Sequence, residues 1–478
     1  MIMSSFSGPP IGGGRCHSTG SRTSHDHTTE VREIFTNNMH GPSLPDDTTV
    51  HLVLDLALKI GEVQMASGAG AADVTATILS VTESYGLPHT EVDVIYTSIS
   101  VSCHRGTGAP PATAVRVVRQ RSLDYTRLAA VEHLVRNLGP IEEAHSQLAQ
   151  ITNAPHPYPR WVATAAWAGM AAAVAFLVGG GLSLAITAAV VTAVIDRVGR
   201  VLNRRALPFF FQQLIGGALA TGAALTVWAT GLLPAVRPSL LVAVGIVVLL
   251  SGLALVSTVQ DAISGYNVTA AGRTVETVLL SAGLIAGVAL AIRTAVHFGL
   301  PIRLTDPLPA LISAVPMQFA AGAATSAFFA LACYARPRAL VAAAVSGAIG
   351  TASYGLATSF GMDALLASAV AAAITGFGGA TMTRRLRIPT LVVVQAGVVP
   401  LLPGWTTYRG LFQLTAEGDP AGLSTLVFAS GIALALAGGV VFGEYLAQPV
   451  RTGLGRLERK FAGPRMSGPL KPTKRRLE

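Results

Sequence analysis

The sequence predicts a polytopic all-α membrane protein with a small α+β region near its N-terminus. Charged residues make up only 12% of the chain and hydrophobic residues 51%, whereas a soluble domain carries about 25% charged residues. From about residue 160 onward the apolar residues form segments close to the roughly 20 residues that a spanning helix needs. The few charges between these segments fall in short clusters, as loops between membrane helices would.

The first 46 residues are rich in Ser, Gly, Pro, His and Thr and show no apolar periodicity. We expect them to form a disordered tail. They lack a basic stretch followed by an apolar one, so no cleavable signal peptide is expected and the N-terminus should stay in the cytosol. The three cysteines are far apart in the chain, which indicates neither a disulfide framework nor a metal site. No cofactor is expected.

Residues 47–152 are predicted to form a cytosolic α+β domain, followed by a Pro-rich linker at 153–160. Helices are expected at 52–66 and 72–85, which end at the Ser67-Gly68 pair and at Gly86. Residues 91–104 alternate with period two and favour one strand or a hairpin, and 112–120 favours a second strand. Asp124 is expected to cap a helix over 123–138, and Pro140 to open another.

Ten apolar segments follow the linker, and we assign five to each of two membrane repeats, 161–298 and 308–446. The predicted spans are 161–178, 181–195, 209–231, 238–259, 274–298, 308–335, 338–358, 363–382, 389–403 and 423–446. A basic cytosolic tail is expected over 447–478.

The arginines test this count, because loops on the cytoplasmic side carry an excess of basic residues. With the N-terminus inside, the outer loops hold four arginines and the inner loops ten. The outer arginines are Arg237, Arg293, Arg303 and Arg409. The inner arginines are Arg197, Arg200, Arg204, Arg205, Arg273, Arg336, Arg338, Arg384, Arg385 and Arg387. Ten helices with both termini inside therefore satisfy the rule.

A weak internal repeat links the fourth and ninth segments. Each begins with a proline, Pro238 or Pro389, followed by a short Leu/Val run, and each later contains a Leu-x-Gly sequence ending at Gly252 or Gly404. Chance resemblance between apolar segments is the alternative. Because five is an odd number, the second repeat would enter the membrane from the opposite side, an arrangement typical of secondary transporters.

The first polar cluster joins the predicted fourth and fifth segments. Charges inside a membrane are costly and often functional, so the cluster indicates a gate or a proton and substrate site; a satisfied loop at the membrane edge is the alternative. Arg273 and Glu276 share a helix face and are able to pair. The candidate residues here are Gln260, Asp261, Gly265, Asn267, Arg273 and Glu276.

The second polar cluster interrupts the ninth segment with two prolines and several glycines. A broken helix leaves backbone groups available to a ligand, and free helix amides or an arginine would suit an amino acid's carboxylate. A proline kink beside a surface arginine is the alternative. The candidate residues here are Gln395, Pro400, Pro403, Gly404, Tyr408 and Arg409.

Proton coupling requires a membrane carboxylate, and the candidates are Asp261, Glu276 and Glu444. Hydration at the cytoplasmic end of the last helix is the other interpretation of Glu444. An enzymatic alternative assembles His89, Asp93, Cys103 and His104 of residues 47–152 into a hydrolase site. No catalytic motif accompanies them, so we expect no enzyme.

Two blocks of sequence, QDAISGYNVTAAGRTVET (260–277) and GVVPLLPGWTTYRG (397–410), resemble the bacterial threonine/serine exporter family. The region GEVQMASGAGAADV (61–74) resembles that family's N-terminal cytosolic part. The resemblance covers about residues 50–450 and implies a single chain with ten spans that exports L-threonine and L-serine across the inner membrane. It also implies a drive by the proton motive force.

The expected partners are a small amino acid, protons and membrane lipid, without nucleic acid, and homo-oligomerisation is left open. A channel or exporter for another small solute is the alternative within transport. A membrane-anchored hydrolase is the alternative outside it.

Overall fold

The structure, a computed structural model, describes residues 46–104, 110–119, 123–231, 236–249, 252–298, 315–386 and 388–447. The predicted tail at 1–46 and the basic tail at 447–478 lie almost wholly outside these ranges. The described residues from Asp47 onward belong to one compact unit.

The region from Asp47 to Asn153, called here the N-terminal region, has the helices and strands that the sequence predicts. Its helices are α2 (Asp47–Ala66), α3 (Ala71–Ser84), α4 (Tyr125–Arg136) and α5 (Ile141–Asn153). Its strands β1 (Thr90–Ile95), β2 (Ser98–Cys103) and β3 (Ala112–Val117) form an antiparallel sheet in the order β1-β2-β3. The hairpin is therefore confirmed. So is the cap of α4, because the Asp124 side chain accepts a hydrogen bond from the Arg127 backbone N–H at 3.0 Å.

One face of this sheet supports α2 and α3. The register places Val92 opposite Val101 and Val94 opposite Ile99, and all four side chains are buried. A Cβ added at Gly61 of α2 would meet the Ile78 side chain of α3 at 2.8 Å. Glycine at this position therefore lets the two helices, which residues 67–70 join, approach closely.

The remaining described helices are long and apolar, and together they make the chain a polytopic membrane protein. They are α6 (Arg160–Leu177), α7 (Leu182–Arg204), α8 (Phe209–Ala229), α9 (Pro238–Leu249), α10 (Gly252–Ile263), α11 (Asn267–His297), α12 (Val315–Ala332), α13 (Pro337–Ser359), α14 (Ala364–Leu386), α15 (Thr390–Val398), α16 (Gly404–Phe412) and α17 (Ala421–Ala447). Within the described ranges, seven helices have the length and composition to cross a membrane, or eight if the bent pair formed by α15 and α16 counts as one span.

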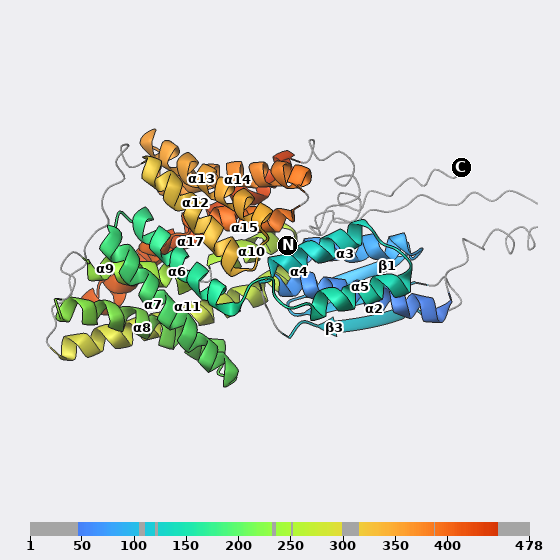
Figure 1. The fold of residues 1–478 in the computed structure, drawn as a ribbon, viewed down its shortest axis with the longest axis horizontal. Coiled ribbons are helices and arrows are strands. Elements are labelled where there is room, and N and C mark those ends of the chain that lie inside the picture. Colours follow the sequence, from blue (N-terminus) through green and yellow to red (C-terminus); the bar gives the residue numbers. More distant parts are fainter. Residues whose placement is uncertain are drawn as a thin grey trace, which may run out of the picture. The chain divides into compact units, whose positions relative to one another are not determined.

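We call α6–α11 the first half and α12–α17 the second half. The same pairs of helices pack in both: α6 with α7 corresponds to α12 with α13, α8 with α11 to α14 with α17, and α10 with α11 to α16 with α17. Figure 1 shows α12, α13 and α14 of the second half side by side, in yellow to orange. Helices α6 and α12 also pack against each other and connect the halves.

The α8–α11 and α14–α17 pairs use the same contact. A Cβ added at Gly283 or Gly287 of α11 would run into the backbone carbonyls of Phe210 or Leu214 on α8. In the second half, Gly439 and Gly443 of α17 lie in the same way on the carbonyls of Ala369 and Ala373 of α14. Both are glycine pairs spaced four residues apart, the pattern that brings helix backbones together in membranes.

The ninth predicted segment is interrupted. It is divided into α15, a short 3₁₀ turn η2 (Val399–Leu401) and α16, with a bend of 44° between its two parts. The predicted break at Pro400 and Pro403 is therefore confirmed. Of the fourth segment, predicted over 238–259, the structure describes α9 and α10, and residues 250–251 lie outside the described ranges.

Two other helices extend beyond their predicted ends. Helix α7 runs nine residues past 195 to Arg204, because Asp196 and Arg200 pair one turn apart and keep the charged end helical. Helix α11 begins at Asn267 rather than 274, because its first turns pack on the N-terminal region. The ten-span layout, which involves segments partly outside the described residues, stays a prediction.

Candidate functional site

A cavity of about 490 Å³ lies between the N-terminal region and helices α10, α15 and α17. Helix α10 contributes Gln260 to this cavity, α15 contributes Gln395 and α17 contributes Glu444. These three belong to the residues that the sequence singled out, and the structure brings them to one place from positions up to 184 residues apart. The Gln260 Nε2 group faces the Glu444 Oε2 atom at 3.4 Å.

The wall that the N-terminal region contributes is polar and acidic. Glu132 and Arg136 of α4 form an ion pair at 2.7 Å. The carboxylate side chains in the lining are those of Asp73, Glu83, Glu132 and Glu444, and Arg136 is the cation among the described lining residues. A zwitterion in this cavity would meet carboxylates suited to its ammonium group and one guanidinium suited to its carboxylate.

Gln395 connects the cavity to the N-terminal region. Its Oε1 accepts a hydrogen bond from the Tyr125 hydroxyl at 3.0 Å, and its Nε2 donates to the Gly68 carbonyl at 3.4 Å. Burial raises the pKa of the Tyr125 phenol well above its usual value, with a smaller contribution from Cys333. The phenol therefore stays protonated near neutral pH and remains the donor in this bond.

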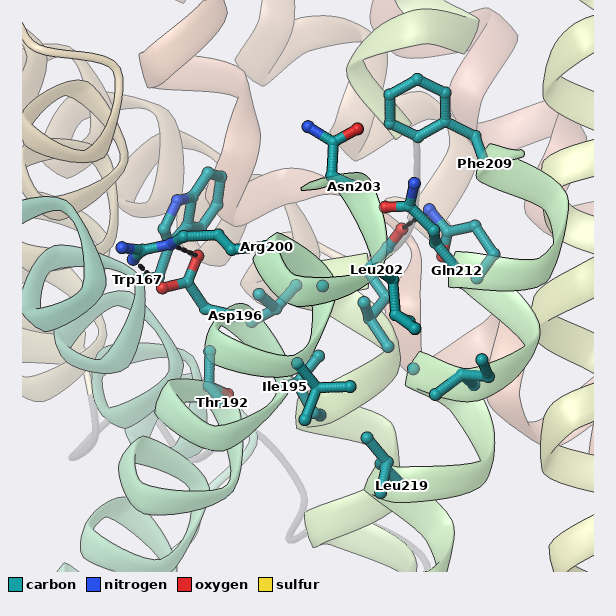
Figure 2. Close-up of a pocket in the computed structure, with 17 residues that line it drawn as sticks. Trp167, Thr192, Ile195, Asp196, Arg200, Leu202, Asn203, Phe209, Gln212 and Leu219 are labelled. Atoms are coloured by element: carbon teal, nitrogen blue, oxygen red, sulfur yellow. Dashed lines mark hydrogen bonds and ion pairs between the residues drawn. The ribbon is translucent and has the colours of Figure 1, made fainter. Parts of the chain in front are cut away.

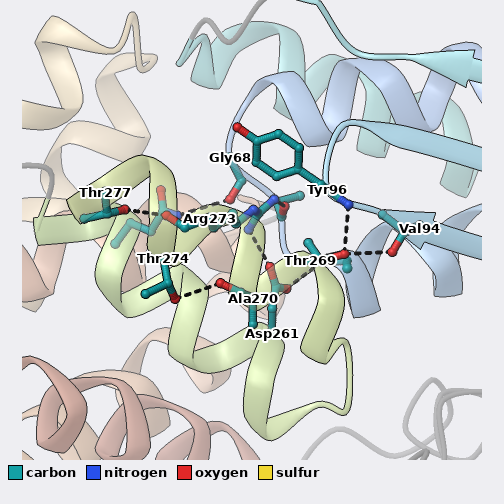
Figure 3. A network of polar contacts seen from close by, with 12 residues as sticks. Gly68, Val94, Tyr96, Asp261, Thr269, Ala270, Arg273, Thr274 and Thr277 are labelled. Carbon is teal, nitrogen blue, oxygen red and sulfur yellow. Dashed lines mark hydrogen bonds and ion pairs between the residues drawn. The ribbon is translucent and has the colours of Figure 1, made fainter. Parts of the chain in front are cut away.

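Asp261 and Arg273 form a buried ion pair beside this cavity. The Asp261 side chain is 1% exposed and that of Arg273 8%, and Arg273 Nη1 lies 2.6 Å from Asp261 Oδ2 (Figure 3). The other carboxylate oxygen accepts from the Ala71 backbone N–H at 2.8 Å, at the first residue of α3. A carboxylate at a helix N-terminus is favoured by the helix dipole, so Asp261 fastens α10 to α3.

Two further contacts extend this attachment. The Thr269 hydroxyl donates to the Val94 carbonyl at 2.8 Å and accepts from the Tyr96 backbone N–H at 3.0 Å, at the turn between β1 and β2 (Figure 3). The Tyr266 hydroxyl bonds the Thr75 hydroxyl at 2.9 Å. The turn between α10 and α11 that makes these contacts possible contains Gly265, whose φ of +87° favours glycine.

The sequence pointed to Asp261, Gly265 and Arg273 because charges and glycines at a membrane edge are unusual. It missed Tyr125, Tyr266 and Thr269, since a tyrosine or threonine near a helix end carries no such signal. The predicted pairing of Arg273 with Glu276 stays a prediction; the ion pair found for Arg273 is with Asp261.

Other residues of the two predicted clusters lie outside the lining of this cavity. Tyr408 is buried against Trp405 and Phe412, and a Cβ at Gly404 would clash with Val247 of α9. Pro400, Pro403 and Glu276 are half-buried, whereas Asn267 and Arg409 are exposed. Gly404 thus lets α16 approach α9 closely. The binding role assigned to Arg409 stays a prediction.

A second cavity of about 330 Å³ lies among α6, α7, α8 and α9. Figure 2 shows Asp196 and Arg200 pointing toward one another beside Trp167. The Gln213 Nε2 group donates to the carbonyl of Leu249, the last residue of α9, at 3.2 Å, and its Oε1 has no partner among the described residues. None of the site residues predicted from the sequence lines this second cavity.

Two residues of the hydrolase alternative lie at the end of β2 and directly after it. Cys103 is fully buried in β2, and His104 pairs with the exposed Glu91 at 3.6 Å. Within the described ranges, no group of three His, Cys, Asp or Glu side chains could hold a metal ion.

Two protein families match the chain. One, described as "Putative threonine/serine exporter", matches residues 55–295, and the other, described as "Threonine/Serine exporter, ThrE", matches residues 318–446. This chain belongs to the threonine/serine exporter family. The boundary between the two matches falls between the first half and the second half of the membrane helices.

Two curated relatives extend over most of the chain. A protein of Mycobacterium tuberculosis named "Probable threonine/serine exporter" is 38% identical over 436 residues, which are 89% of this chain and 81% of that protein. A protein of Corynebacterium glutamicum named "Threonine/serine exporter" is 34% identical over 423 residues, 86% of each chain. No solved structure matches the chain.

Proposed function

We propose that this protein exports small hydroxylated amino acids, L-threonine and L-serine, from the cytoplasm across the bacterial inner membrane. The observation that carries the proposal is the 490 Å³ cavity to which α10 and α15 each contribute a glutamine. Its volume falls within the range of small-molecule sites. The names of the two relatives supply the substrate class.

The substrate would lie in this cavity with its ammonium group toward the carboxylates and its own carboxylate toward Arg136. Gln260 of α10 and Gln395 of α15 would contribute amide groups. Because the N-terminal region forms one wall, the cavity corresponds to the state that receives substrate from the cytoplasm.

Transport would proceed by alternating access between the two halves, arranged as inverted repeats of five spans each. The equivalent helix pairs and the matching glycine contacts of α11 and α17 support an internal repeat. The orientation with both termini in the cytoplasm is supported by the N-terminal region. It contacts Asp261 before the α10–α11 turn and the Cys333 carbonyl before α13, two turns that the arginine pattern assigns to the inside.

We assign proton coupling to Glu444 among the three candidate carboxylates. It lines the cavity and contacts Gln260, so a proton on Glu444 would change the charge that a substrate meets. Asp261 is engaged by Arg273 and by the N-terminus of α3, and Glu276 lies outside the cavity lining.

The test is export of threonine from cells fed a threonine-containing dipeptide, with and without this protein. We expect lower intracellular threonine with the protein, and loss of that difference when a protonophore collapses the proton gradient. Glu444→Gln should reduce export at least tenfold while the amount of protein in the membrane is unchanged. Equal threonine in both strains would overturn the proposal, and export that persists on ATP alone would overturn the proton drive.

A further inference from the structure

Gln64, near the end of α2, presents a buried hydrogen-bonding atom that the fold leaves unused. Its side chain is 5% exposed, and its Nε2 donates to the Thr77 hydroxyl of α3 at 3.1 Å. Its Oε1 is buried and has no hydrogen-bond partner among the described residues. An unsatisfied buried acceptor costs about 1–3 kcal/mol, and a hydrogen-bond donor supplied by a bound molecule would remove that cost.

Gln64 and Thr77 both line the 490 Å³ cavity, as do Asp73 and Gln395. The Thr77 contact fixes the orientation of the amide. The loop after α2 is held in turn, because the Gly68 carbonyl accepts from Gln395 and the Ala69 carbonyl accepts from Arg273 at 3.4 Å. The hydrogen bond to Thr77 therefore orients the Gln64 amide, and the bonds from Gln395 and Arg273 hold the loop that follows α2.

A neutral acceptor whose amide is already oriented suits a neutral donor such as a hydroxyl group. The ammonium group of an amino acid has the carboxylates of the same wall available. Threonine differs from valine, and serine from alanine, in having a hydroxyl group that can donate a hydrogen bond. A site built to bond a hydroxyl rejects the analogue without it strongly, because the buried partner is then left unpaired.

We propose that Gln64 Oε1 accepts the hydrogen bond of the substrate's side-chain hydroxyl and thereby selects threonine and serine over valine and alanine. This inference rests on the proposed function. It assigns to the N-terminal region a direct part in substrate recognition, with Gln64 as a binding residue and Thr77 as the residue that positions it.

The experiment measures displacement of radiolabelled threonine from the purified full-length protein by unlabelled threonine, serine, valine and alanine. In the unaltered protein we expect valine to displace at least about 100-fold more weakly than threonine. Gln64→Leu should reduce that ratio to below about tenfold by weakening threonine and leaving valine unchanged. Thr77→Val, which removes only the anchor of the amide, should reduce the ratio by a smaller factor.

Gln213→Leu is the matched control. Gln213 also has a buried Oε1 without a partner in the described part of the chain, but it lies in the other cavity. The threonine-to-valine ratio of this variant should equal that of the unaltered protein. If Gln64→Leu does not fold, Thr77→Val carries the test, because it removes the hydroxyl that orients the Gln64 amide.

The outcomes separate the two proposals. An unchanged ratio in both Gln64→Leu and Thr77→Val, with threonine still bound, overturns this inference and leaves the proposed function standing. An equal loss of threonine and valine also overturns it, because Gln64 would then contact a group that both share. If the unaltered protein binds neither threonine nor serine, the proposed function fails and this inference fails with it.

Discussion

The first half (α6–α11) and the second half (α12–α17) have the same packing and different polar groups. The glycine pair Gly283 and Gly287 lies on α8 as Gly439 and Gly443 lie on α14. The two halves differ in the charges that α10 and α16 carry. Near its end α10 has a buried carboxylate, Asp261, whereas α16 has the exposed Arg409.

The N-terminal region explains this difference. It contacts α10 and α11 through Asp261, Tyr266 and Thr269. The buried Asp261 carboxylate is tolerated there because Arg273 and the first backbone amide of α3 both bond to it. In the inverted arrangement proposed above, α16 faces the side of the membrane opposite to the N-terminal region. The helix packing is therefore repeated in both halves, whereas the charged side chains depend on what the ends of the helices contact.

The largest expected effect is at the buried pair. Asp261→Ala leaves Arg273 buried without its ion-pair partner and should lower the free energy of unfolding by about 3–5 kcal/mol. The measurement is thermal unfolding of the purified protein in detergent. The double variant Asp261→Leu with Arg273→Met should recover most of the loss, since a hydrophobic pair of similar volume often replaces a buried ion pair at little cost.

Asp196→Ala is the matched control for that variant. It removes the same type of ion pair, with Arg200, but the side chains are 19% and 28% exposed. A partly solvated pair one helical turn apart contributes about 0–1 kcal/mol. A loss as large at Asp196 as at Asp261 would contradict the view that burial under the N-terminal region sets the difference between the two pairs.

The glycine contacts should respond equally in both halves, with the next largest effect. Gly287→Ala and Gly443→Ala each place a Cβ against a backbone carbonyl of the neighbouring helix, and such overpacking costs about 1–3 kcal/mol. Gly222→Ala in α8 and Gly438→Ala in α17 are the controls, because their added Cβ atoms meet open space. They should be neutral or stabilising by up to about 1 kcal/mol.

Thermal unfolding of the four variants decides whether the halves share one packing. A clear loss at Gly287 with none at Gly443, or the reverse, would break the comparison, since the close approach would then matter in one half alone.

The sequence was sufficient for features that depend on local physics. Alternation and capping located the strands and α4, and Pro400 with Pro403 located the break in the ninth segment, because proline cannot continue a helix. The ion pair between Arg273 and Asp261 was not predicted, because it depends on how α10 folds back beside α11.

The cavity itself was beyond the sequence. Gln260, Gln395 and Glu444 were each selected as polar residues in apolar surroundings, but nothing in the sequence indicated that they meet. Gln64 was not selected at all, because a glutamine near the end of an amphipathic helix is typical of a solvated surface. Its burial and its contact with Thr77 depend on how α2 and α3 pack.

A smaller effect is expected at the hydrogen bond between Tyr125 and Gln395. Tyr125→Phe removes the donor and should lower the free energy of unfolding by about 1 kcal/mol at neutral pH. The raised pKa of the phenol adds a pH dependence. Stability from the neutral phenol is present below the unfolded pKa of about 10 and is lost as the pH rises toward the folded value.

Unfolding measured from pH 7 to 11 tests this. The unaltered protein should lose stability above pH 10 more steeply than Tyr125→Phe, which has no phenol to ionise. Parallel profiles for the two proteins would contradict the burial of an ionisable donor between α4 and α15.

The smallest effect on stability is expected at Arg409, where the second half differs most from Asp261. Its side chain is exposed on α16, so Arg409→Ala should change the free energy of unfolding by no more than about 0.5 kcal/mol. If Arg409 holds the substrate carboxylate when the site opens outward, the same variant should abolish threonine efflux. Thermal unfolding and efflux measured on one preparation separate these properties, and normal efflux would remove Arg409 from the site. Stable protein without efflux would mean that the two halves divide their charges by task, since the charge at Asp261 would hold the N-terminal region and that at Arg409 the leaving substrate.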